Sequence, residues 1–66
     1  MKRFEILDLI EELGFQHLAT MLDENEFTIY DSIEHLNSCK NECTEEEFPS
    51  SVYDAVIGLL DLFYSL

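Results

Sequence analysis

The chain has little positive charge. Its 66 residues include only three lysines and arginines against fifteen aspartates and glutamates, so the net charge at pH 7 is −12. Such a surface repels nucleic acid and anionic membranes, because both carry dense negative charge. We therefore expect no direct nucleic-acid ligand and no membrane partner, and we expect attraction to basic protein surfaces.

Turn-forming residues and long apolar segments are also scarce. Two glycines and one proline are too few for a small all-β domain, whereas 47% hydrophobic residues are too many for a disordered chain. The longest uncharged apolar run, residues 55–60, is far shorter than a membrane span. Glu5 and Asp8 interrupt the segment that a secretory signal would need, so we expect a cytoplasmic protein. The length allows one acidic domain, residues 1–66, with a small core.

The most apolar stretch is residues 51–66. On a helix, its few polar or glycine positions fall on one thin line: Ser51, Asp54, Gly58, Asp61 and Ser65. A helix that is apolar around most of its circumference is typical of the centre of a core. The sequence therefore predicts a largely buried C-terminal helix, with Ser51 and Asp54 as its capping pair or Ser50 as its cap instead.

Two helices are predicted near the N-terminus. Apolar residues recur at three- and four-residue spacings over residues 2–13 and again over residues 15–22. Between them stands Gly14, where a left-handed residue can end a helix, and Phe15 can fold back on that helix as in a Schellman motif.

A third helix is predicted over residues 28–38. Thr28 can cap it together with Asp31, three residues further on. Residues 37–50 then form the one long connection, with room for a single helical turn begun by Thr44. The expected fold is all-α, a compact bundle of four to five short helices packed around a largely buried C-terminal helix.

Part of this pattern resembles the sterile alpha motif (SAM) family. The resemblance covers residues 9–28, Leu36, residues 44–48 and the long last helix, about two thirds of the chain. The chain departs from the family by extra sequence at residues 38–43, by a shorter connection before the final helix, and by lacking the basic start of that helix. The resemblance implies a five-helix bundle and a protein-binding module that has an acidic binding face only.

Four candidate metal ligands follow one another at four-residue spacing: Asp31, His35, Cys39 and Cys43. If the third helix continued through them, they would line one face with ligand types that suit zinc. Asn37, Ser38 and Asn41 disfavour a helix at that point, and the sequence has no CxxC pair. We therefore expect no metal and no other cofactor, with His35, Cys39 and Cys43 as the ligands if a metal binds. The cysteines are expected to be reduced.

No combination of residues indicates catalysis. His17 has no cysteine or second histidine near it in the sequence. Acid–base catalysis by carboxylates needs a pocket that separates two pKa values, and a chain this short leaves little room for one. The sequence has no nucleophile motif, no phosphate-binding glycine loop and no Walker lysine. We expect that the protein is not an enzyme.

The charge is the strongest functional signal. Acids three or four residues apart on a helix lie about 5–6 Å from one another, comparable with successive phosphates of a nucleic-acid strand. Solubility of a small domain needs a net charge of only about 2–8, so a charge of −12 indicates a partner. The predicted partner-binding residues are Asp23, Glu24, Glu26, Asp31, Glu34, Glu5, Asp8 and Glu12.

Three functions fit these observations. The first is a non-enzymatic inhibitor or regulator that docks on a basic, nucleic-acid-binding surface of a partner protein. In size and charge it is similar to small acidic inhibitors of viral origin, including anti-CRISPR proteins and DNA mimics. The second is a SAM-like protein-interaction adaptor. The third is a homodimeric structural subunit, favoured by more apolar residues than a small bundle can bury: Tyr30, Phe48, Tyr53, Phe63, Tyr64 and Leu66.

Overall fold

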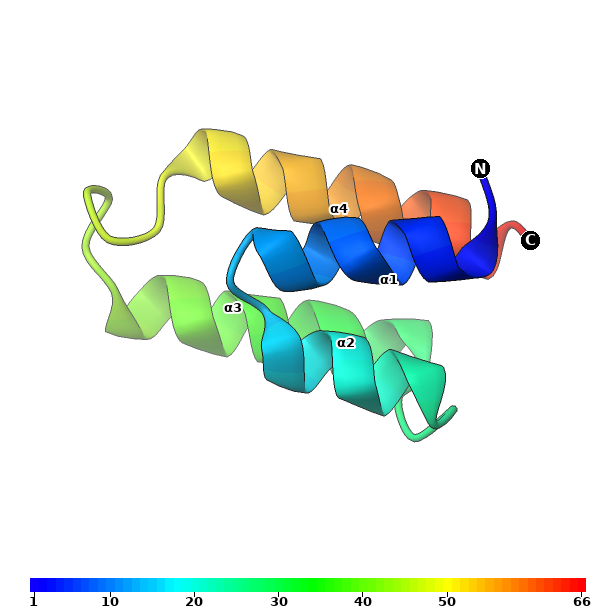
Figure 1. Ribbon diagram of the computed structural model, residues 1–66. Helices are drawn as coiled ribbons and strands as arrows, with labels where there is room; N and C mark the ends of the chain where they lie inside the picture. The colour runs from blue at the N-terminus through cyan, green and yellow to red at the C-terminus, as the bar shows by residue number, and fades with distance from the viewer.

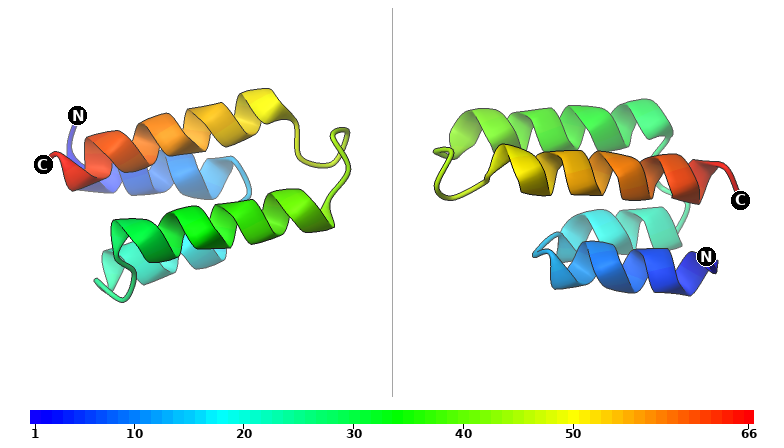
Figure 2. Two further views of the ribbon diagram at one scale, coloured as in Figure 1. Left: turned by 180° about the vertical axis from the view of Figure 1, so that it is seen from behind. Right: turned by 90° about the horizontal axis from the view of Figure 1, so that it is seen from above.

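The fold consists of four α-helices without strands. The computed structural model describes residues 1–66, with α1 at Arg3–Glu12, α2 at Gln16–Asp23, α3 at Ile29–Glu42 and α4 at Ser50–Tyr64. Each helix runs antiparallel to the next, and both termini lie at one end of the bundle (Figures 1 and 2). The predicted all-α bundle is confirmed. None of the four helices has the length and apolar character that a membrane span requires.

The core lies between the helices. α1 packs against α2 and α4, and α4 also packs against α3. Three of the ten buried apolar residues come from α1 and three from α2, so the N-terminal half supplies most of the core. The ten residues are Ile6, Leu7, Ile10, Leu18, Ala19, Leu22, Leu36, Phe48, Val56 and Leu60.

α4 is less buried than its composition predicts. Only Val56 and Leu60 are buried, whereas Leu62 is 48% exposed and Tyr64 is 37% exposed. The main neighbours of α4 are α1 and α3, and two neighbours cover only one side of a helix. The core is therefore shared among the helices instead of surrounding α4.

The first two helices end in the same way. Gly14 has a φ of +100°, and the Phe15 N–H donates to the Ile10 carbonyl at 3.2 Å, which confirms the predicted Schellman motif. Asn25, with a φ of +58°, ends α2, and the N–H of the following residue donates to the Met21 carbonyl at 2.9 Å. Both turns reverse the chain within a few residues, which makes α1, α2 and α3 antiparallel.

α3 begins as predicted but ends later. Thr28 Oγ1 accepts from the Asp31 N–H at 3.2 Å, and Asp31 Oδ2 accepts from the Thr28 N–H at 3.0 Å. The helix then continues to Glu42, so its predicted end at residue 38 is wrong. Tertiary contacts outweigh the weak local propensity, because Cys39 packs against the core and Lys40 Nζ donates to the Phe48 carbonyl. One turn earlier, Tyr53 Oη of α4 donates to Asn37 Oδ1 at 2.6 Å.

The connection before α4 holds the predicted helical turn. The Phe48 N–H donates to the Thr44 carbonyl at 2.9 Å. Both predicted caps of α4 are wrong, Ser51 with Asp54 and the alternative Ser50, because the N-cap residue is Pro49 and no hydrogen bond from a side chain of its own caps the helix. Instead, Glu45 Oε1 accepts from the Ser50 N–H at 2.8 Å.

Candidate protein-binding surface

Acidic side chains dominate the surface, because the three cations are few and two of them are held in ion pairs within the molecule. All fifteen carboxylate residues are exposed. Arg3 Nη1 donates to Asp23 Oδ1 at 3.0 Å, and Lys40 Nζ donates to Glu45 Oε2 at 2.7 Å. Two of the fifteen acids are thus paired and thirteen have no cationic partner, while Lys2 is the one lysine or arginine outside an ion pair.

Both paired cations also bind backbone and aromatic groups. Arg3 Nη2 donates to the Leu22 and Asp23 carbonyls at 3.0 Å, and the Arg3 guanidinium lies 5.2 Å from the centre of the Phe63 ring. Lys40 Nζ donates to the Phe48 carbonyl as well as to Glu45. Each cation therefore ties separate segments together, and neither is free to meet an acidic ligand.

The contact with Lys40 lowers the pKa of Glu45. Hydrogen bonds from Lys40 and from the backbone and hydroxyl of Ser50 lower the pKa of the Glu45 carboxyl from its usual 4.5 to about 2. Glu45 therefore stays ionised at any pH near neutrality. It joins the end of α3 to the start of α4 and is not a free acidic group.

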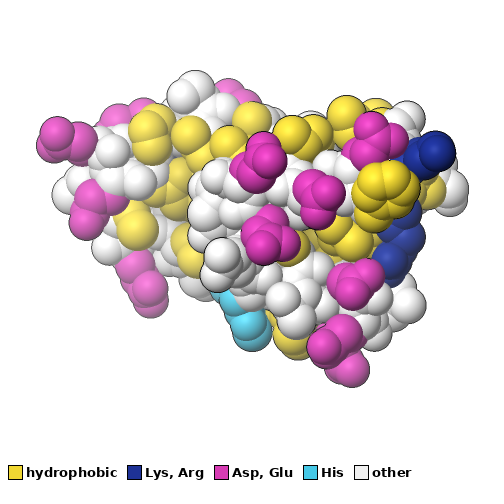
Figure 3. Space-filling model, viewed as in Figure 1, with side chains coloured by type: hydrophobic (Ala, Val, Ile, Leu, Met, Phe, Trp, Pro, Cys, Tyr) yellow, Lys and Arg dark blue, Asp and Glu magenta, His cyan; other side chains and the backbone are white.

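The acids of α1 form the first part of the surface. Glu5, Asp8 and Glu12 are exposed, as is Glu11. Asp8, Glu11, Glu12 and Gln16 line a shallow depression that has no apolar side chain. Figure 3 shows acidic side chains spread over the face on which α1 lies in front. The predicted partner-binding residues do not include Glu11. Its spacing of three residues from Asp8 already placed it on the same side of the helix.

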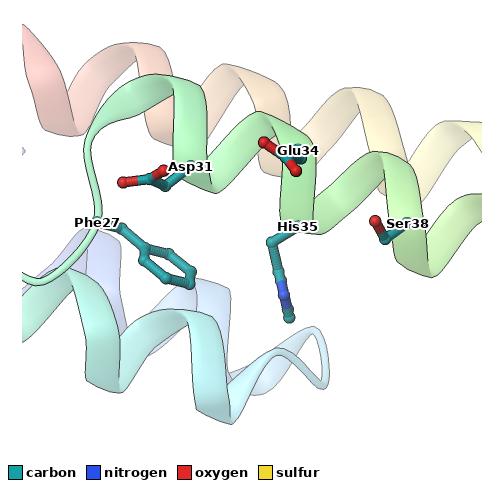
Figure 4. A pocket seen from close by; sticks show the side chains of 5 residues that line it. All are labelled: Phe27, Asp31, Glu34, His35 and Ser38. Carbon is teal, nitrogen blue, oxygen red and sulfur yellow. The ribbon is translucent and has the colours of Figure 1, made fainter.

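A second acidic area lies along α3. Asp31 and Glu34 line a depression together with Phe27, His35 and Ser38. In Figure 4 the Phe27 and His35 side chains extend from the α3 side toward α2, and the two acids lie higher on α3. Asp31 also caps its own helix, so its carboxylate has a structural role besides its charge.

The other predicted residues lie around the end of α2. Asp23 is the last residue of α2 and is paired with Arg3, which offsets its charge. Glu24 and Glu26 follow it and are exposed without a cationic partner. The eight predicted residues therefore lie on α1, at the end of α2, on the α2–α3 connection and on α3. Their contact with a partner stays a prediction.

Two histidines that are distant in the sequence meet between α2 and α3. The ring centres of His17 and His35 are 5.6 Å apart, and the Phe27 ring centre is 6.3 Å from His17 and 5.9 Å from His35. Burial, and then the neighbouring His17, lower the pKa of His35 below its usual 6.5. Sequence reasoning missed this pair, since only the packing of two helices brings the rings together.

The candidate metal ligands share one helix face only in part. Because α3 continues, His35 and Cys39 do meet, with His35 Nε2 3.7 Å from Cys39 Sγ. Burial, and then Cys43 and Glu42, raise the pKa of the Cys39 thiol, which disfavours the thiolate that a metal needs. Cys43 is exposed and extended at the end of the helix. No group of three or more histidine, cysteine, aspartate or glutamate side chains is placed to hold a metal ion.

No protein-family model, curated protein or solved structure matches this chain. Function is therefore inferred from its own surface. That surface offers exposed carboxylates on short helices, which can attract and hold basic side chains.

Proposed function

We propose that this protein is a non-enzymatic inhibitor or regulator that binds the basic, nucleic-acid-binding surface of a partner protein, in the manner of anti-defence proteins and DNA mimics. The observation that carries the proposal is that two of the three cations are held in ion pairs within the molecule. With Arg3 and Lys40 both held in ion pairs, thirteen unpaired acids face the solvent against one free lysine, Lys2.

The positions of the acids support binding to a basic cleft. Asp8 and Glu12 stand one turn apart on α1, and Asp31 and Glu34 stand one turn apart on α3. Such pairs on a helix lie about 5–6 Å apart, which lets basic side chains spaced for nucleic-acid phosphates meet them. Because the helices hold the acids in place, little ordering is needed on binding. A summed field of this sign also steers a basic partner during approach and raises the on-rate.

A homodimer is the second candidate, supported by exposed apolar residues on two adjacent helices. Leu9 of α1 is 37% exposed, and Leu13 just after α1 is 39% exposed. Leu62 of α4 is 48% exposed, and Leu66 beyond α4 is 66% exposed. α1 and α4 pack against each other, so a second copy could cover both. The net charge opposes this association at low salt, because two copies of charge −12 repel each other.

Fewer of the expected interface residues are available than the sequence indicated. Phe48 is buried, and Tyr53 and Phe63 are partly buried against the core. Tyr64 Oη donates to the Phe27 carbonyl at 2.9 Å, which fixes α4 to the start of α3. Tyr30, at 80% exposure, has no such role in the fold.

Competition with nucleic acid tests the first candidate. Partner proteins are captured from a nuclease-treated lysate, and each purified partner is titrated with labelled DNA or RNA in the presence of this protein. We expect mutually exclusive binding that weakens as salt rises from about 0.05 to 0.5 M, since screening shortens the range of surface charges. Simultaneous binding of nucleic acid and this protein to the partner would contradict the inhibitor proposal.

Charge-reversed variants identify the surface. Glu24, Glu26 and Glu34 are changed to Lys in one variant, and Asp8 and Glu12 in another. Asp23 and Asp31 are left unchanged, because they bind Arg3 and cap α3. We expect a slower on-rate with little loss of helicity, and unchanged binding by both variants would show that the charge serves solubility alone.

Sedimentation at high salt tests the second candidate, the homodimer, since a dimer held by apolar contacts should persist there.

A further inference from the structure

A groove between α1 and α2 combines an apolar floor with an acidic rim. Its apolar residues are Phe4, Leu7 and Ala19, and Asp8, Glu11 and Asp23 stand around them. The groove has a volume of about 260 Å³ and is partly open to solvent. In Figure 3, apolar side chains near the start of α1 lie among acidic ones on this face.

Phe4 is the unusual member of the groove. It is the most exposed apolar residue of α1, at 60%, whereas Leu7 and Ala19, which line the groove with it, are 8% and 5% exposed. A ring that contacts the floor on one side and solvent on the other can be covered by an incoming apolar side chain without rearranging the core. Aromatic residues in such positions carry much of the binding energy of protein interfaces.

The charges of the rim are uneven. Asp23 is already paired with Arg3 at 3.0 Å on the α2 side. Asp8 and Glu11, one turn apart on α1, have no cationic partner. These two residues also line the neighbouring polar depression with Glu12 and Gln16. Free negative charge is therefore concentrated along the α1 edge.

This combination selects one kind of occupant. A second copy of the chain would bring acid against acid, and an anionic lipid surface would be repelled in the same way. A basic amphipathic helix meets both requirements, because its apolar face can enter the groove while Lys or Arg residues on one flank face the free acids. Cations one turn apart would match the spacing of Asp8 and Glu11.

We propose that the α1–α2 groove binds a basic amphipathic helix of the partner, with an apolar side chain over Phe4, Leu7 and Ala19 and two cations one turn apart facing Asp8 and Glu11. The inference rests on the proposed function and names the part of the partner that is recognised. It adds an apolar anchor to a surface that would otherwise bind through charge alone. It also predicts that the acidic area of α3 contributes to approach but not to this contact.

The test uses the full chain and synthetic peptides. The probe is an 18-residue amphipathic helix with leucines on one face and arginines one turn apart on one flank. A scrambled peptide of the same composition is the control, since it keeps the charge and loses the apolar face. Binding is followed by NMR chemical shifts of the backbone amides and by titration at two salt concentrations.

We expect the amphipathic peptide to shift amides of α1 and α2 around Phe4, Leu7 and Ala19, and the scrambled peptide to leave them in place. Phe4→Ala should weaken binding at least about tenfold, as loss of a central aromatic contact does. Asp8→Asn combined with Glu11→Gln should weaken it and reduce its salt dependence. Thr20→Arg, which places a cation in the groove at an exposed residue, should also block the peptide.

Matched variants on α3 control for general effects. Tyr30→Ala removes an aromatic residue that is more exposed than Phe4, and Glu34→Gln removes one acid outside the groove. Both should bind the peptide as the parent does. The proposal is overturned if the scrambled peptide binds equally well, or if Phe4→Ala and Thr20→Arg, shown by circular dichroism to be folded, retain the parent affinity.

The same variants separate this inference from the proposed function. If charge reversal abolishes binding to the captured partner and Phe4→Ala does not change it, the groove is wrong and the acidic inhibitor stands. If nucleic acid and this protein bind the partner together while Phe4→Ala still abolishes binding, the groove stands and nucleic-acid competition is wrong.

Discussion

The two glycines of this chain should respond to alanine in opposite directions. A Cβ added at Gly14 or at Gly58 meets no other atom within 4 Å, so neither substitution causes a collision. Gly58 lies inside α4 with ordinary helical backbone, whereas Gly14 has a φ of +100° at the end of α1. Backbone conformation alone should therefore decide the sign of the change.

The expected magnitudes follow from these conformations. Alanine in place of a glycine inside a helix stabilises by about 0.5–1 kcal/mol, because it restricts the unfolded chain and favours helical backbone. Alanine at Gly14 should destabilise by roughly 1–2 kcal/mol, the cost of left-handed backbone for an L-residue. Since about 1 kcal/mol shifts the Tm of a domain this small by roughly 4–8 °C, the two variants should melt well apart.

Thermal and urea unfolding followed by circular dichroism, at fixed salt and protein concentration, measure both changes. A Gly58→Ala variant that melts below the parent would contradict the reasoning, because it would mean that the open side of α4 is covered in solution. Repeating the melt at several protein concentrations would show whether a second copy covers it. A Gly14→Ala variant that is as stable as the parent would mean that α1 does not end in a left-handed turn at this residue.

Three further predictions concern the core and the titrating groups. Leu60→Ala should lower the free energy of unfolding, measured in urea, by about 2–5 kcal/mol, because Leu60 is 1% exposed. Leu62→Ala should change that free energy by less than about 0.5 kcal/mol, because Leu62 is 48% exposed. Lowering the pH from about 7 to 5 should reduce the free energy of unfolding, because His35 takes up its proton at a higher pH in the unfolded chain than in the folded protein. His35→Gln should weaken this dependence of stability on pH. An equally steep dependence in that variant would contradict the role of His35. The contribution of Glu45 to folding stability should be complete above its usual pKa of 4.5 and should be lost as the pH falls toward 2. NMR titration should therefore find the Glu45 carboxyl ionised at pH 3.5, and Glu45→Gln should remove this part of the loss of stability in acid.

Local signals in the sequence determined the end of α1, the start of α3 and the turn before α4. Gly14, the pair of Thr28 with Asp31, and the turn begun by Thr44 all act within a few residues, because the unpaired backbone groups at a helix end are satisfied by their neighbours in the chain. Composition alone likewise predicted the all-α fold and an acidic exterior. These features require no knowledge of which helices pack together.

Only the tertiary structure decided the features that depend on distant partners. α3 continues beyond residue 38, where Cys39 packs against the core and Lys40 binds the Phe48 carbonyl. α4 begins at Ser50, whose N–H is bound by Glu45 of the preceding turn. The many apolar residues of α4 predicted a central, buried helix. How far a helix is buried depends on how many other helices pack around it, and in this four-helix fold too few do so.

The candidate surface shows the same division. The sequence determined that the acids far outnumber the cations and that helical spacing groups them on outer faces. It could not determine that Arg3 reaches Asp23, twenty positions away, or that the His17 and His35 rings meet. It also could not place Phe4 at a groove with Ala19. Such contacts depend on the angles and distances between packed helices, which no spacing within a single helix specifies.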